Sequence, residues 1–283
     1  MVTSSDDKLE IERGGLMLGI LRSGAVCIKE MMRAPFDRVK LLLQTQAVNE
    51  KLVGKNYKGI VDAFKRIRKE EGRRAFWRGG VPMVLKSIIY DDIVSPTEYF
   101  NFLGFVLAYP LELARTRLAA DVGKGKSERQ FTGFLDCFRK VYKAEGIQGI
   151  YRGFGALSMG IMVYKSILSV GSRYLYPFMD DLPPNSILSH DLKFFASHHR
   201  EAQLLFTSGF FLYYPFDTVS RRLMVQSGRK DVLYTGTVDC FKKIAQNEGL
   251  KGFYKGCLIP FFGLWTVNVL FPNMMFFSLK QIV

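Results

Sequence analysis

The feature that most constrains the fold of this chain is an internal repeat, which occurs three times in 283 residues. Each copy opens with a proline that an acid follows two positions later. An aromatic-x-Gly-x-x-Asp segment, a Glu-Gly pair and an aromatic-base-Gly triplet then follow in the same order. The three copies of the triplet end at Gly79, Gly153 and Gly256. Self-similarity of this kind indicates a repeat architecture in which each copy forms one supersecondary unit.

Each repeat combines a short amphipathic segment with longer apolar ones. In the first copy, Ile60, Phe64 and Ile67 recur at helical spacing and the pattern ends at Gly72, which predicts a short helix. Apolar stretches precede each proline and follow each triplet, and they predict three pairs of membrane helices. Charges interrupt these stretches and should therefore face a bundle interior or an aqueous cavity. They are Lys29, Glu30, Lys86 and Lys165.

Composition agrees with a basic membrane protein. Hydrophobic residues make up 48% of the chain, and 40 Lys and Arg stand against 26 Asp and Glu. Such a balance suits contact with anionic headgroups or anionic substrates. The basic residues are spread along the whole chain, which argues against a nucleic-acid partner. The four cysteines form no CxxC pair and no metal-ligand spacing, and no nucleophile-base arrangement predicts an enzyme.

These motifs resemble those of the mitochondrial carrier family over essentially the whole chain. Segments 115–125, 214–219, 226–230 and 234–240 are similar to the ADP/ATP carriers of that family. The resemblance implies an all-α membrane protein in the mitochondrial inner membrane, with three tandem repeats of two transmembrane helices plus a short matrix helix. The expected repeats are residues 1–99, 100–190 and 191–283. Proteins of this kind exchange ADP and ATP by alternating access.

The resemblance also implies a ring of gate ion pairs formed by the residues that follow each proline. Asp37 is expected to pair with Arg115, and Asp217 with Lys40. The partner expected for Glu112 is Ser220, which carries no charge. One ion pair of the ring is therefore predicted to be missing.

Two ligand sites follow from the same resemblance. The vestigial nucleotide-binding residues are Lys86, Gly160, Ile161, Tyr164 and Arg221. Glu30 replaces a lysine and Gly263 replaces an arginine, so the expected pocket loses positive charge. Cardiolipin, the only bound molecule expected besides substrate, is predicted to bind near repeated glycines, because helix N-termini attract anions. These are Gly59, Gly79, Gly133, Gly153, Gly236 and Gly256.

Chain length predicts a further departure. Arg152 and Pro215 are 63 positions apart, but Arg78 and Pro110 are only 32 positions apart. Since a spanning helix needs ~20 residues, two full helices and a loop do not fit into the shorter interval. The second and third helices are therefore predicted to be shortened, which truncates the end of the first repeat and the start of the second.

Three functions remain open at this point. The first is a transport-defective carrier that serves as a structural or accessory subunit of a larger inner-membrane complex, possibly a respiratory one, with other subunits covering the shortened helices. The alternative is a functional ADP/ATP antiporter, and a carrier for another, smaller anion is a third reading. Only the antiporter requires ADP and ATP as ligands.

Overall fold

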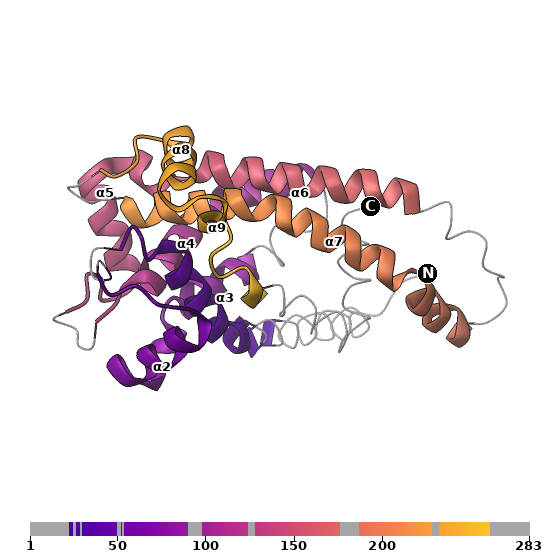
Figure 1. The fold of residues 1–283 in the computed structure, drawn as a ribbon, viewed down its shortest axis with the longest axis horizontal. Coiled ribbons are helices and arrows are strands. Elements are labelled where there is room, and N and C mark those ends of the chain that lie inside the picture. Colours follow the sequence, from indigo (N-terminus) through magenta and orange to yellow (C-terminus); the bar gives the residue numbers. More distant parts are fainter. Residues whose placement is uncertain are drawn as a thin grey trace, which may run out of the picture. The chain divides into compact units, whose positions relative to one another are not determined.

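The computed structural model describes residues 23–260, except 25–26, 29, 50–51, 53, 90–97, 124–127, 176–186 and 228–231. Within these residues every regular element is a helix (Figure 1). Lys29 and Gly263 lie outside the described residues. The expected all-α fold is confirmed by this arrangement together with the comparisons reported below.

The first proline motif lies in a helix that covers residues 30–45, here called the Pro35 helix. The elements that follow are α2 (Ile60–Glu70), η2 (Arg73–Trp77), α3 (Gly80–Ile88), α4 (Glu98–Ala120), α5 (Phe134–Ile150), α6 (Phe154–Leu175), α7 (Ile187–Gln226), α8 (Thr237–Glu248) and α9 (Leu250–Phe253). Pro110 lies inside α4 and Pro215 inside α7. All three repeated prolines are therefore helical.

The chain divides into two compact units. Unit 1 comprises residues 1–38 and 66–140, and unit 2 comprises residues 39–65 and 141–283. Each unit combines parts of more than one sequence repeat, so the predicted repeat boundaries stay a prediction. The units are described separately below.

In unit 2, α6 and α7 lie side by side along most of the length of α6 (Figure 1). A small residue brings them together, because a Cβ at Gly160 would lie 2.7 Å from the Cβ of Phe216. A core of buried residues lies at the end of the unit that contains α8 and α9. This core contains Val48, Ala156, Val219, Leu223, Tyr234, Cys240, Ile244 and Phe253.

In unit 1, α3 packs against α4. Gly79, at the start of α3, has φ +81°, and a Cβ there would lie 2.8 Å from the carbonyl oxygen of Arg115. Only glycine tolerates both this backbone conformation and this approach. This close approach lets α3 pack tightly against α4. Met83 on α3 and Leu113 on α4 are both buried.

The short helices α2, α5 and α8 share one N-terminal arrangement. The repeated aspartate of each accepts a hydrogen bond from a backbone N–H four residues earlier, at 2.9 Å for Asp62, 3.0 Å for Asp136 and 3.0 Å for Asp239. The donor lies two residues before the first helical residue, so the contact ties the incoming chain to the first helical turn, much as a capping box does. The short amphipathic helix predicted after Gly59 is confirmed as α2, which ends two residues before Gly72.

Helix lengths differ among the described elements. α6 has 22 residues, and its segment Phe154–Gly171 is the one stretch in the described part of the chain that is long and apolar enough to cross a membrane by itself. α3 has nine residues and α4 has 23. The segment between α3 and α4 lies outside the described residues, so the shortening of the second and third helices remains a prediction.

Candidate functional site

The Glu-Gly pair and the aromatic-base-Gly triplet are joined by an ion pair in every repeat. Glu71 pairs with Arg78 in unit 1. In unit 2, Glu145 lies 2.7 Å from Arg152, and Glu248 lies 2.5 Å from Lys255. Each acid precedes its base by seven residues. This contact explains why the two motifs recur together at fixed spacing.

Glu248 shows how firmly such a carboxylate is held. Burial alone would raise its pKa, but hydrogen bonds from Arg222 and Lys255 outweigh burial and lower the pKa to about 2. Arg222 donates through two guanidinium nitrogens and is itself fully buried. The Arg222–Glu248 pair therefore fixes α7 to the C-terminal end of α8.

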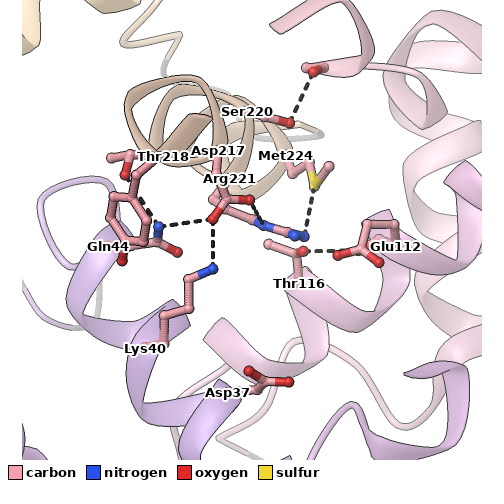
Figure 2. Close-up of polar contacts among 12 residues, drawn as sticks. Asp37, Lys40, Gln44, Glu112, Thr116, Asp217, Thr218, Ser220, Arg221 and Met224 are labelled. Carbon is pink, nitrogen blue, oxygen red and sulfur yellow. Dashed lines mark hydrogen bonds and ion pairs between the residues drawn. The ribbon is translucent and has the colours of Figure 1, made fainter. Parts of the chain in front are cut away.

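Asp217, the acid of the third proline motif, is the most heavily hydrogen-bonded carboxylate of the described part of unit 2. Figure 2 shows Lys40 and Gln44 pointing at it from the Pro35 helix, with distances of 2.7 and 3.1 Å. On α7 itself, Arg221 and Tyr213 donate to the other carboxylate oxygen, at 3.1 and 3.2 Å. Asp217 is fully buried, so these donors replace the water that a charged group needs.

The first proline motif forms the corresponding pair inside unit 1. A guanidinium nitrogen of Arg115 lies 2.7 Å from Asp37, and both side chains are about one-seventh exposed. The two pairs expected from the resemblance, Asp37 with Arg115 and Asp217 with Lys40, are therefore both present as contacts. Their role as a gate stays a prediction.

Glu112 has a different partner from the one in the expected ring. The ammonium of Lys86, on α3, lies 2.7 Å from the Oε2 of Glu112, on α4. Arg115 approaches Oε1 of the same carboxylate at 3.5 Å. Sequence reasoning assigned Lys86 to nucleotide binding and missed this contact. The contact depends on how α3 packs against α4, which the sequence alone does not give.

Ser220, the uncharged residue at the third base position, is engaged locally. Its hydroxyl donates to the carbonyl of Gly153 at 2.9 Å, and the residue is fully buried. A neutral hydroxyl held in this way supplies no charge to a carboxylate.

Glu30 extends the charged cluster of unit 1 along the Pro35 helix. Arg33 lies 3.7 Å from Glu30 and 3.9 Å from Asp37. Acids and bases therefore alternate through this part of unit 1. The sequence of contacts, called here the unit 1 charge cluster, is Glu30, Arg33, Asp37, Arg115, Glu112 and Lys86. It holds three acids and three bases, so its net charge is zero.

The other residues expected at a nucleotide lie against α7 in unit 2. Gly160 faces the side chains of Phe216 and Tyr213. Tyr164 contacts the Tyr213 ring, with 6.1 Å between the centroids, while Ile161 is half-buried. Arg221 is buried against Asp217. Helix packing and ion pairing account for these contacts, and nucleotide binding by these residues stays a prediction.

The glycines expected near cardiolipin fall into two groups. Gly79, Gly153 and Gly256 approach backbone carbonyl oxygens of Arg115, Ser220 and Lys40 at the positions where a Cβ would stand. Gly59, Gly133 and Gly236, at the starts of the short helices, have open space there. In the described residues, no group of three or more His, Cys, Asp or Glu side chains could hold a metal ion.

The family of the chain follows from a match along almost its whole length. The family described as "Mitochondrial carrier protein" matches residues 18–94, 102–179 and 207–277, one segment for each repeat. The chain belongs to the mitochondrial carrier family.

The chain is similar to several members of that family. ADP/ATP translocase 2 of Bos taurus is 38% identical over 264 residues, which cover 82% of this chain and 86% of the translocase. ADP/ATP translocase 3 of Homo sapiens shows the same identity and coverage. The mitochondrial substrate carrier family protein ancA of Dictyostelium discoideum is 39% identical over 263 residues, which cover 82% of each chain.

Membership settles two points. Proteins of this family are transporters and not enzymes. The family and the similarity to ADP/ATP translocases place this chain in the mitochondrial inner membrane. Its substrate does not follow from membership.

Proposed function

We propose that this chain is an ADP/ATP-carrier-like protein that has lost nucleotide exchange and serves as a structural or accessory subunit of a larger inner-membrane complex. One observation carries the proposal, namely that the unit 1 charge cluster is neutral within itself. Lys86, the base expected at the nucleotide, is bound to Glu112 at 2.7 Å. Glu30, which stands where a lysine is expected, adds a buried acid.

Electrostatics explains why this arrangement disfavours a nucleotide. ADP and ATP carry a charge of about −3 to −4, and their binding in a cavity depends on bases whose charge is not already neutralised. To contact a phosphate, Lys86 would have to leave the buried Glu112 carboxylate and lose a short, charge-assisted hydrogen bond. Arg221 would have to leave Asp217 for the same purpose. Each such step opposes binding.

The expected partners follow from chain length and from the glycines. Shortened second and third helices would leave one side of a carrier bundle for other inner-membrane subunits to cover, and a respiratory complex is the natural candidate. Membrane lipid, with cardiolipin at Gly59, Gly133 and Gly236, would fill further gaps. Open space at these three glycines supports a close approach of an anionic headgroup to the helix starts.

Reconstitution tests the proposal. The purified chain in liposomes loaded with ADP should show no saturable uptake of labelled ATP, while an ADP/ATP translocase reconstituted in parallel does. On a native gel of digitonin-solubilised mitochondria, the chain should migrate with a large complex. Saturable exchange, or migration only at the mass of the monomer, would overturn the proposal.

A functional ADP/ATP antiporter remains the second candidate, and a specific observation favours it. The ion pairs Asp37–Arg115 and Lys40–Asp217 are both formed. The 38% identity to ADP/ATP translocases supports the same reading. The liposome assay distinguishes the two candidates, because only the antiporter predicts exchange.

A further inference from the structure

Four bases lie close together in the sequence, on both sides of the turn at Gly72 in unit 1. Arg68 and Lys69 belong to the last turn of α2, while Arg73 and Arg74 begin η2. All four residues are exposed. The dipole of α2 favours bases at its C-terminal end, which explains the first two bases but not the second two. These four residues are called here the basic patch.

The acids next to the basic patch are engaged with other bases. Glu70 pairs with Arg66 on the same helix, at 3.1 Å. Only 2% of the Glu71 side chain is exposed, and its carboxylate pairs with Arg38 and Arg78. In the described part of the chain, no ion pair includes a base of the basic patch. The patch therefore presents four positive charges to whatever lies against it.

The other two repeats differ from the first at this turn. Arg73 follows the glycine of the Glu-Gly pair, and the residues that correspond to it are Ile147 and Leu250. These two aliphatic residues are 65% and 77% exposed. An exposed aliphatic side chain beside bases suits insertion at a membrane surface. The first repeat has a second charged residue, Arg74, instead of such a side chain, so its turn is less suited to lipid.

An exposed aromatic ring lies beside the basic patch. Trp77 ends η2 and is 46% exposed. It follows Arg74 by three residues, a spacing that places both on one face of a 3-10 helix. Its indole N–H donates to the carbonyl of Met31 at 3.0 Å, so the polar end of the ring already has a partner within unit 1. Arginine and tryptophan together are typical of protein–protein interfaces.

We propose that the basic patch binds an acidic segment of another protein subunit, with the Trp77 ring packed against the same segment. Charge complementarity selects this partner, because an arginine fork pairs with a carboxylate through two hydrogen bonds. Opposite charges across an interface also fix the orientation of the two chains. The inference rests on the proposed function, since it names the surface through which the chain would join its complex.

The test compares the natural chain with a patch variant that carries Arg68→Gln, Lys69→Gln, Arg73→Gln and Arg74→Gln. Each is produced in cells that lack the other, and digitonin-solubilised mitochondria are run on a native gel. We expect about tenfold less of the patch variant than of the natural chain in the large complex. Raising KCl from about 50 mM to about 500 mM should release the natural chain as well, because salt screens exposed charges.

Two outcomes separate this inference from the proposed function. A patch variant that stays in the complex at the natural level would overturn the inference and leave the proposed function standing. A natural chain that migrates only as a monomer would overturn both.

A matched variant controls for net charge. It carries Arg139→Gln, Lys143→Gln, Lys242→Gln and Lys251→Gln, which remove four exposed bases from the second and third repeats. This variant should stay in the complex, and equal release of both variants would contradict a role for the basic patch. Both purified variants should unfold within about 2 °C of the natural chain. If the patch variant does not fold, the pair Arg73→Gln and Arg74→Gln replaces it and should reduce the complex about threefold.

Anionic lipid is the other partner that the test must distinguish. Cardiolipin added to the purified proteins in detergent should raise the unfolding midpoint of the patch variant as much as that of the matched variant. A smaller rise in the patch variant would show that the basic patch contacts lipid headgroups, and would overturn the inference.

Discussion

The hydroxyl of Ser220 donates a hydrogen bond to the backbone carbonyl of Gly153, at 2.9 Å. At the same point a Cβ on Gly153 would lie 2.8 Å from the carbonyl oxygen of Ser220. The two backbones therefore meet where the aromatic-base-Gly triplet of one repeat adjoins the proline motif of the next. The serine at position 220 adds a hydrogen bond to this junction between α6 and α7. An arginine or lysine there would place its charged group away from the junction.

Replacing Gly153 by alanine should destabilise the protein strongly. Gly153 has φ +86°, a conformation that costs a residue with a side chain ~1–2 kcal/mol, and the added methyl group would collide with a backbone oxygen. We expect a total loss of about 2 kcal/mol or more, measured as a lower midpoint of thermal unfolding in detergent. Gly155→Ala is the matched control, because that glycine lies in α6 with open space around it. An equal effect at both positions would contradict the packing described here.

Replacing Asp217 by asparagine should disrupt the junction between the Pro35 helix and α7. The carboxylate accepts hydrogen bonds from Lys40, Gln44 and Arg221, and it is fully buried. Asparagine would remove the buried negative charge that Lys40 and Arg221 both contact, for which we expect a loss of about 3–5 kcal/mol. Denaturation in increasing concentrations of a harsh detergent measures the change.

Asp239→Asn provides the control for that substitution. Asp239, at the start of α8, accepts a hydrogen bond from the backbone N–H of Thr235 and pairs with Lys243, but its side chain is 29% exposed. Its replacement should change resistance to denaturation far less than Asp217→Asn does. If the two variants behave alike, the burial of Asp217 is not what makes its charge important.

Acid should selectively remove the contribution of Glu248. Its pKa is lowered from 4.5 to about 2 in the folded chain by Arg222 and Lys255, against the opposing effect of burial. A carboxyl group with a lowered pKa stabilises the folded state above its unfolded pKa and loses that contribution as the pH falls toward the folded value. The difference in unfolding midpoint between the natural chain and Glu248→Gln should therefore be full at pH 7 and shrink between about pH 4.5 and pH 2.

Glu70→Gln is the matched control for the acid experiment. Glu70 is paired with Arg66 on α2, but about half of its side chain is exposed. Surface pairs of this kind contribute little. The midpoint of this variant should follow that of the natural chain at every pH, and a parallel loss in both variants would show that general acid expansion dominates.

The repeats allowed much of the local structure to be predicted from sequence. A short amphipathic helix after Gly59 followed from the spacing of Ile60, Phe64 and Ile67, because helical periodicity is a local property. Pairing of Asp37 with Arg115 came from the family pattern, and the structure contains that contact. A pattern that occurs three times predicts helices and ion pairs well, because each copy supports the interpretation of the other two.

Contacts created by departures from the repeat were not predictable in the same way. Lys86 occupies a position where the resemblance implies a nucleotide-binding base, and only its distance to Glu112 shows a different engagement. Arg33 balances Glu30 one turn away on the same helix, a relation that spacing could have revealed. Neither contact has a counterpart in the other two repeats. When one residue of the repeat is replaced, a neighbouring side chain balances the charge of the residue that it leaves. Which neighbour can do so depends on how the helices pack.

Thiol reactivity should divide the four cysteines into two pairs. Cys137 and Cys240 are fully buried in α5 and α8, and burial raises the pKa of their thiols to about 11 and about 12. Because the thiolate is the reactive form, N-ethylmaleimide at pH 7.5 should leave both unmodified in the folded protein. Cys27 and Cys257 are partly exposed and should react. Mass spectrometry should therefore find two adducts before unfolding in dodecyl sulfate and four afterwards. Modification of Cys137 or Cys240 in the folded protein would contradict the packing of the short helices against the cores of their units.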